Sequence, residues 1–105
     1  MIAKTTPPPY YAVIFTSIKN IDDDGYDEMA IKMVELGSKM PGFLGIESAR
    51  NEIGITVSYW ATLDDIKSWK QETEHLLAQK MGIEKWYAAY KTRICKVERD
   101  YSFEK

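Results

Sequence analysis

Few side chains in this sequence could perform acid–base, redox or metal chemistry. The chain of 105 residues contains one histidine, His75, and one cysteine, Cys95. A single cysteine excludes an internal disulfide and a cysteine cage for a metal ion, and a single histidine excludes a multi-histidine metal site within one chain. Because His75 is the side chain best suited to act as a base near neutral pH, we take it as the candidate catalytic residue.

Three consecutive aspartates at positions 22–24 are the densest group of possible calcium ligands. An EF-hand loop alternates its acidic residues, ends in a glutamate at its twelfth position and lies between two helices. The segment has none of these features, and acidic residues ahead of a helix favour the positive end of its dipole. We interpret the aspartates as part of a loop. With no glycine-rich phosphate loop in the chain either, we expect no metal, flavin or other cofactor.

Aromatic side chains form the second group with a possible part in ligand binding. Tyr59 and Trp60 must point to opposite faces of a strand, so only one of them can face the helices. Core packing is an alternative explanation for Trp69, and Arg50 and Arg93 are candidates for neutralising an anionic ligand. The candidate pocket residues are Tyr59, Trp60, Trp69, Trp86 and Tyr87.

The residue types along the chain predict the strands that carry these aromatic side chains. Segment 10–18 is rich in aromatic and β-branched residues and is apolar on both faces, which is typical of a strand covered on two sides. Segments 43–50 and 54–61, joined by a short turn, predict a β-hairpin. A last strand is predicted over 89–97, with a charged tail after it.

Two helices are predicted from apolar residues at helical spacing. The first covers 26–39 and ends at a Pro-Gly pair, and the second covers 63–80, with Thr62 as its N-cap and Asp65 at the third position. Residues 83–87 suggest one further turn. The predicted inner faces comprise Tyr26, Met29, Ala30, Met33, Val34 and Leu36 in the first helix, and Leu63, Ile66, Trp69, Thr73, Leu76 and Leu77 in the second.

The direction of His75 depends on the continuity of the second helix. At 100° per residue on an unbroken helix, His75 lies roughly opposite the apolar face and points to solvent. A break near 71–73, where Thr73 is a weak helix former, would turn His75 toward Trp69. Both alternatives are consistent with the sequence.

The order strand, helix, strand, strand, helix, strand predicts an α+β fold of the ferredoxin-like βαββαβ type. It places four antiparallel strands in one sheet with both helices on one face. The first strand is apolar on both faces, and helices cover only one of them, so we expect a homodimer joined through the other sheet face. Residues 1–8 form an N-terminal arm and 9–105 a single domain.

Several segments carry a family resemblance: 10–18, 40–45, 58–60, Trp69 with His75, and 84–87. Together they resemble the antibiotic biosynthesis monooxygenase domain, a branch of the dimeric α+β barrel superfamily, over about residues 9–103. The resemblance implies a homodimer whose sheets form a barrel, with a pocket between helices and sheet in each subunit. Some members oxidise polycyclic aromatic phenols with molecular oxygen and no metal or flavin, others degrade haem, and others have no known reaction.

The haem-degrading branch uses an asparagine on the first strand, a tryptophan on the second helix and an iron-ligating histidine further along that helix. Trp69 matches the tryptophan. Segment 10–18 contains no asparagine, and the position of the histidine lies nearer Gln79 than His75. Haem degradation is therefore the weaker alternative.

Cofactor-free oxygenation requires a base, an aromatic pocket for a flat anion and exclusion of water around it. We expect a cofactor-independent monooxygenase that acts on a small aromatic or quinoid substrate. The alternative is a non-catalytic dimeric α+β barrel that binds a small ligand. A buried titratable group beside the aromatic wall favours the enzyme, and an apolar pocket with His75 in solvent favours the binding protein.

Composition limits the remaining classes of partner. Hydrophobic residues make up 45% and charged residues 29%, as in ordinary globular proteins, and a net charge of -2 gives no general attraction to nucleic acid. No apolar run reaches the roughly 18 residues that span a bilayer, and the first residues lack the apolar core of a secretory signal. We expect a cytoplasmic protein with a reduced Cys95 and no nucleic-acid or membrane partner.

Overall fold

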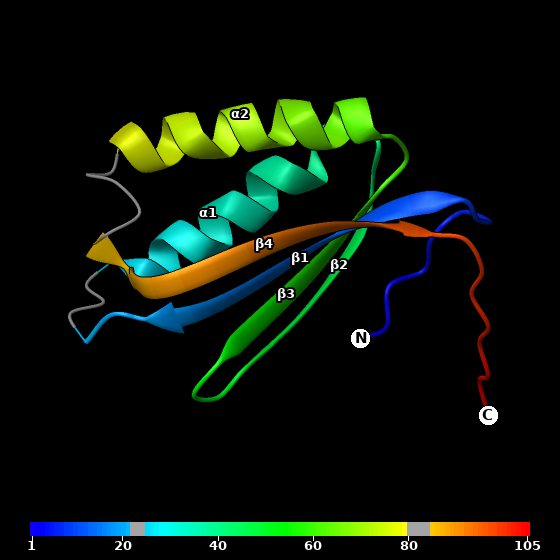
Figure 1. The fold of residues 1–105 in the computed structure, drawn as a ribbon, viewed down its shortest axis with the longest axis horizontal. Coiled ribbons are helices and arrows are strands. Elements are labelled where there is room, and N and C mark those ends of the chain that lie inside the picture. The colour runs from blue at the N-terminus through cyan, green and yellow to red at the C-terminus, as the bar shows by residue number, and fades with distance from the viewer. Residues whose placement is uncertain (22–24, 80–84) are drawn as a thin grey trace.

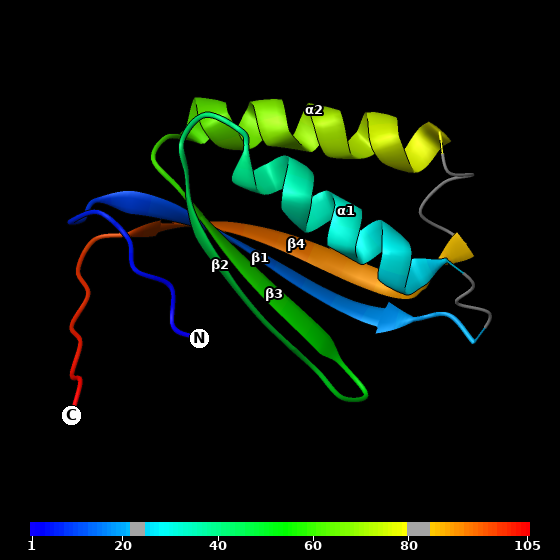
Figure 2. The same ribbon diagram turned by 180° about the vertical axis from the view of Figure 1, so that it is seen from behind.

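Four strands and two helices follow one another in the predicted βαββαβ order. The computed structural model describes residues 1–21, 25–79 and 85–105. The elements are β1 (Tyr10–Lys19), α1 (Tyr26–Ser38), β2 (Phe43–Arg50), β3 (Gly54–Trp60), α2 (Leu63–Gln79) and β4 (Tyr87–Val97). The strands form one antiparallel sheet in the order β2-β3-β1-β4, and both helices lie on one face of it (Figures 1 and 2). The predicted ferredoxin-like α+β fold is confirmed.

Most element boundaries lie within two residues of their predicted positions. The largest difference is at β4, which begins at Tyr87 and pairs it with Lys19 across a shift in register after Ile18. The further turn predicted over 83–87 lies partly outside the described residues, and Tyr87 itself belongs to the strand.

The register of β1 assigns each side chain to one face of the sheet. Ser17 pairs with Gly54, and Tyr11 pairs with Trp60, whose ring stacks on Trp69 of α2. Because successive side chains alternate, the odd-numbered residues of β1 face the helices. The opposite surface, here called the open face, carries Ala12, Ile14, Thr16, Ile55, Val57 and Tyr59.

The start of α2 is capped as predicted. The Thr62 hydroxyl accepts a hydrogen bond from the Asp65 backbone N–H at 3.0 Å and donates one to the Asp65 carboxylate at 2.7 Å. Nearby, Gly42 adopts φ 81, and a Cβ at that residue would lie 1.9 Å from an Asp65 oxygen. The turn into β2 therefore requires glycine both for its backbone and for space.

The predicted inner faces of the helices need correction at their edges. Val34, Leu36 and Leu63 are exposed, with 44%, 37% and 53% of their surfaces accessible. In α1, Met29 is buried as predicted, and Gly37 is buried as well, because its lack of a side chain brings the helix against Trp69 of α2. In α2, Ile66 and Leu76 are buried, Trp69 and Thr73 are half-buried, and the side chain of Leu77 lies outside the described part.

Both chain ends lie on the open-face side of the sheet, at the same end (Figure 1). The Ala3 N–H donates to a Glu47 carboxylate oxygen at 2.9 Å, and a Cβ on Gly45 would lie 2.8 Å from the Ala3 methyl group. The Tyr10 hydroxyl donates to Asp100 at 2.6 Å. Arm and tail thus cover only one end of the open face. Of the described helices, none is both long and apolar enough to cross a membrane.

Candidate functional site

The space between the helices and the sheet has two aromatic ends. At the first end, Trp60 of β3 is fully buried and stacks on Trp69 of α2, with ring centroids 5.9 Å apart. Phe43 contacts the Trp60 ring edge-on at 5.5 Å, and the Trp60 indole N–H donates to Ser58 Oγ at 2.9 Å. We call this set the tryptophan end. The indole N–H of Trp60 is thus satisfied within this set.

Gly37 brings α1 directly onto the tryptophan end. A Cβ at Gly37 would lie 3.3 Å from the Trp69 ring, which is tighter than ordinary van der Waals contact. Trp69 is therefore held between Gly37 on one side and Trp60 on the other. These contacts make both indoles part of the hydrophobic core.

The second end is built from aromatic residues on three elements. Tyr26, which begins α1, contacts Tyr87 of β4 edge-on at 5.6 Å, and Phe15 of β1 lies 5.4 Å from Tyr87 and 5.5 Å from Tyr90. Burial and the hydrogen bond with Tyr26 raise the pKa of Tyr87, so that it stays protonated at neutral pH. Tyr87 therefore offers a hydroxyl inside an aromatic setting.

Arg50, the last residue of β2, brings a cation to this second end. Its Nη2 donates to the hydroxyl of the buried Ser17 and, at 3.3 Å, to the hydroxyl of Tyr26. Its guanidinium carbon lies 5.5 Å from the Tyr26 ring centroid. Gly54 makes room, because a Cβ there would lie 2.1 Å from Nη2. We call the set Ser17, Tyr26, Arg50 and Tyr87 the arginine end.

Thr73 lies on α2 one helical turn after Trp69, between the two ends. Its hydroxyl oxygen is buried and has no hydrogen-bond partner. Unsatisfied buried hydroxyls cost free energy and are uncommon in folded proteins. A ligand oxygen beside Thr73 would satisfy this group.

His75 is exposed on α2. The helix continues without interruption from Leu63 to Gln79, so the break considered near 71–73 is not present. On a continuous helix His75 lies nine residues and thus about 180° from the buried Ile66. The solvent-directed alternative for His75 is the one that the structure shows.

Tyr59 lies on the open face, opposite its neighbour Trp60. Its hydroxyl donates to Glu47 at 2.6 Å, and its ring contacts Tyr10 edge-on at 5.9 Å. Burial and the Glu47 carboxylate raise the pKa of Tyr59 to about 12. Tyr59 is thus outside the layer between helices and sheet, where the resemblance implied the pocket.

Three other candidates take different places. Trp86 is buried against Met29, where it forms a small core cluster beneath α1. Arg93 and Cys95 are exposed, and both point to the open face because they pair with Ile14 and Ala12. Only Arg50 of the two candidate arginines belongs to the aromatic layer.

Sequence reasoning missed Ser17, Tyr26 and Thr73 as site residues. Ser17 and Tyr26 are far from Arg50 in the chain, and only the strand register places Arg50 and Ser17 on either side of Gly54. The usable signal was Gly54 at the first position of a strand, a residue type that often marks a close approach of another group.

Two open hollows lie on the surface, and the second shares Ser17 with the arginine end. One of about 310 Å³ is on the outer side of α1, and one of about 210 Å³ lies at the end of β1. Their lining residues are Ala30, Ile31, Val34 and Glu35 for the first, and Thr16, Ser17, Ile18, Ile53, Ala89, Tyr90 and Lys91 for the second. Over the described part of the chain, histidine, cysteine and carboxylate side chains form no group of three that could hold a metal ion.

Comparison with known proteins gives both a relative and a fold. No family model matches the chain. The uncharacterized protein YqjZ of Bacillus subtilis is 49% identical over 105 residues, which cover 98% of this chain and 92% of YqjZ.

Among solved structures, the cofactor-independent oxygenase SnoaB from Streptomyces nogalater superposes with a TM-score of 0.72 at 7% identity, over 89% of this chain and 97% of SnoaB. PA3566 from Pseudomonas aeruginosa gives 0.68 at 16%, over 91% and 99%. A Nitrosomonas europaea protein provisionally assigned as an antibiotic biosynthesis monooxygenase gives 0.66 at 18%, over 90% and 94%. The chain therefore has the fold of the antibiotic biosynthesis monooxygenase domain and belongs to one family with YqjZ.

Proposed function

We propose that this protein is a cofactor-independent monooxygenase of the antibiotic biosynthesis monooxygenase type that acts on a small aromatic or quinoid substrate. The observation that carries the proposal is the buried, unpartnered hydroxyl of Thr73 within a layer lined by aromatic rings. The fold shared with SnoaB, an oxygenase that needs no cofactor, supports the same class of reaction.

In this mechanism the substrate itself reduces oxygen. A phenol or enol loses a proton, and its electron-rich anion passes electrons to O₂. One oxygen atom enters the ring carbon and the other leaves as water, as in the oxidation of an anthrone to an anthraquinone. The protein must hold the flat ring and stabilise the anion. In this proposal Tyr87 serves as a pocket wall, and Arg50 supplies the positive charge.

The proton of the bound phenol can leave by either of two routes, and the two can be told apart. If His75 is the base, α2 must open after Lys70 when substrate binds. If the guanidinium of Arg50 lowers the pKa of the bound phenol enough, the proton leaves to solvent and His75 plays no part. The exposed position of His75 favours the second version.

Oxygen uptake with anthrones and simple hydroquinones as probes tests the proposal. We expect uptake above the protein-free rate and a His75→Ala rate within about twofold of the wild type. A loss of about 10²-fold or more in His75→Ala would restore His75 as general base. Absence of enhanced uptake for every probe contradicts the enzymatic proposal.

A second candidate function is non-catalytic binding of a small ligand. The exposure of His75 is the observation that favours it, because it leaves the aromatic layer without a group that titrates near neutral pH. Tight binding of an anthrone with no acceleration of its oxidation would select this candidate. Turnover would eliminate it.

For either candidate, we propose a homodimer joined through the open face. Ile18 and Ile55 on this face are 47% and 46% exposed in the single chain, and the N-terminal arm covers only the far end. Obligate interfaces of this kind bury on the order of 2,000 Å² or more. Sedimentation should give a dimer at micromolar concentration and a monomer for Ile55→Lys; a monomeric wild type contradicts the proposal.

A further inference from the structure

We propose that the arginine end recognises an ionised oxygen on an aromatic ligand, a carboxylate or a phenolate attached to the ring. This inference rests on the proposed function for the location of the ligand, between helices and sheet. It deepens that function by assigning the substrate class: an aromatic anion rather than a neutral hydrocarbon or ketone.

The first argument is the charge of Arg50. No carboxylate among the described residues forms an ion pair with it, although Glu47 lies on the same strand. Glu47 points to the open face and accepts hydrogen bonds from Tyr59 and Ala3 instead. An arginine that a fold positions without neutralising retains its charge for a ligand, and its planar fork suits carboxylate and phenolate oxygens.

The second argument is that the guanidinium is held in place before any ligand arrives. Both of its hydrogen bonds come from Nη2, toward Ser17 and Tyr26, which leaves the Nε and Nη1 donors for a ligand oxygen. Ser17 is only 2% exposed, so the anchor is rigid. Gly54 beneath the guanidinium has no side chain that would push it into solvent. A preorganised donor binds with less loss of conformational entropy.

The third argument is the aromatic setting around this cation. Tyr90 is 50% exposed and stacks on Phe15 at 5.5 Å, so its ring offers a partly open surface for a flat ligand. Tyr87 lies 6.3 Å from Tyr90 and continues the same surface. A ring bound there would place a substituent near the guanidinium, through the contacts that join Tyr87, Tyr26 and Arg50.

Among the residues that the structure describes, charges on neighbouring elements do not cancel the charge of Arg50. The Lys19 ammonium lies 4.7 Å from the Tyr26 ring centroid. Asp27 and Glu28, in the first turn of α1, are exposed. The positive groups therefore contact the aromatic layer directly, and solvent screens the carboxylates of α1.

The experiment compares the binding of matched charged and neutral aromatics by the full-length protein. The probes are 2-naphthoate, the neutral 2-naphthamide and a nitro-substituted naphthol that is ionised at pH 8, each titrated by calorimetry. The variants are Arg50→Gln and Arg50→Lys. Arg93→Gln removes another exposed arginine, from the open face, and serves as the matched control once sedimentation shows that it keeps the oligomeric state of the wild type.

We expect Arg50→Gln to weaken naphthoate binding roughly tenfold or more, as expected for loss of a charge-assisted hydrogen bond, with naphthamide unchanged. Arg50→Lys should recover part of the affinity, and Arg93→Gln should match the wild type. A preference for naphthoate or for the naphtholate identifies carboxylate or phenolate as the natural group.

The inference is overturned if Arg50→Gln lowers the affinities for naphthoate and naphthamide equally. It is also overturned if Arg50→Gln and Arg93→Gln lower the naphthoate affinity equally, or if the wild type binds neither anion. Circular dichroism confirms that each variant is folded. Oxygen uptake is a separate readout. Charge-selective binding without oxygen uptake supports the anion site but contradicts the proposed enzymatic function. Oxygen uptake without charge-selective binding supports the enzymatic function but contradicts the anion site.

Discussion

The two ends of the helix–sheet layer use the same kinds of side chain for different purposes. At the tryptophan end, Trp60 is fully buried and its indole N–H is satisfied by Ser58 on the same strand. At the arginine end, the Tyr26 hydroxyl accepts a hydrogen bond from Arg50, a cation that has no carboxylate partner among the described residues. The indole N–H of Trp60 is therefore not available to a ligand, whereas Arg50 keeps its Nε and Nη1 donors.

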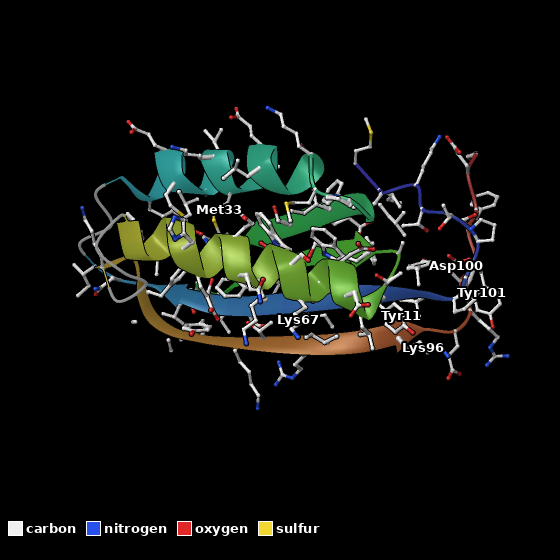
Figure 3. All side chains as sticks on the ribbon, turned by 90° about the horizontal axis from the view of Figure 1, so that it is seen from above. Tyr11, Met33, Lys67, Lys96, Asp100 and Tyr101 are labelled. Carbon is white, nitrogen blue, oxygen red and sulfur yellow. The ribbon has the colours of Figure 1, made fainter. Side chains whose placement is uncertain are left out.

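Aromatic content alone therefore does not locate a binding site in this fold. Figure 3 shows the helix layer from above, with Met33 between the two helices and with Asp100 and Tyr101 beyond the N-terminal end of α2. What separates the two ends is whether polar groups are satisfied within the fold. Substitutions at each end should therefore change different quantities, stability at one and ligand selectivity at the other.

The largest expected effect is at the tryptophan end. Trp60→Ala removes a fully buried ring and its contacts with Trp69 and Phe43, and should lower the free energy of unfolding by about 3–5 kcal/mol. Urea denaturation with tyrosine fluorescence measures it. Tyr26→Ala at the other end, where the ring is only half-buried, is the comparison. An equal loss in both variants would remove the distinction between the ends.

Two glycine substitutions sharpen the comparison. Gly37→Ala places a methyl group 3.3 Å from the Trp69 ring, which is fixed on both sides, and should destabilise by about 1–2 kcal/mol. Gly54→Ala meets only the end of the Arg50 side chain and would push the guanidinium away from Ser17 and Tyr26, so stability should change by less than about 1 kcal/mol while naphthoate selectivity is lost. Calorimetric melting and naphthoate titration measure the two effects. The comparison fails if Gly54→Ala loses more stability than Gly37→Ala, or if Gly37→Ala is the variant that loses selectivity.

Thr73 lies between the ends, and its removal should have a smaller effect of opposite sign. Thr73→Val replaces an unpartnered buried hydroxyl with a methyl group of similar size, so the free energy of unfolding should rise by about 1 kcal/mol. Affinity for a hydroxylated aromatic should fall. Thr73→Ser, which keeps the hydroxyl, is the control for binding. A destabilised Thr73→Val would show that the hydroxyl has a partner in solution.

The sequence was sufficient for the fold because its signals are local. The hairpin predicted over 43–50 and 54–61 and the Thr62–Asp65 cap each depend on residues close in the chain, and both were confirmed, with the second strand ending at Trp60. The site was not predictable to the same degree, because it depends on register. Arg50, Ser17 and Tyr26 meet only after three elements have paired, and no short-range pattern connects them.

His75 and Tyr59 illustrate the same limit. His75 points to solvent on an unbroken helix and toward Trp69 if the helix breaks near 71–73, and the sequence allowed both. The continuity of α2 decides between them. Alternation on a strand showed that Tyr59 and Trp60 differ in direction but not which of them faces α2. That choice follows from Trp60 pairing with Tyr11 and stacking on Trp69.

The smallest predicted effect concerns pH and lies outside both ends. Hydrogen bonds from Tyr59 and then from the Ala3 N–H lower the pKa of Glu47. The carboxylate therefore stabilises the folded state above its ordinary pKa of 4.5, and this contribution disappears as the pH falls through the lower, folded value. Glu47→Gln should cost about 0.5 kcal/mol near neutral pH and abolish that acid dependence.

Amide exchange of Ala3 is the sharper measurement for this prediction, because Glu47 also holds the N-terminal arm. Protection of Ala3 should be present at pH 6 and decrease on acidification, and in Glu47→Gln it should be weaker and should not change with pH over this range. Ligand selectivity should not change, since Glu47 and Arg50 lie on opposite faces of the sheet. If acidification or Glu47→Gln altered naphthoate binding, the arm and the arginine end would be coupled, and the separation of the two faces would not hold.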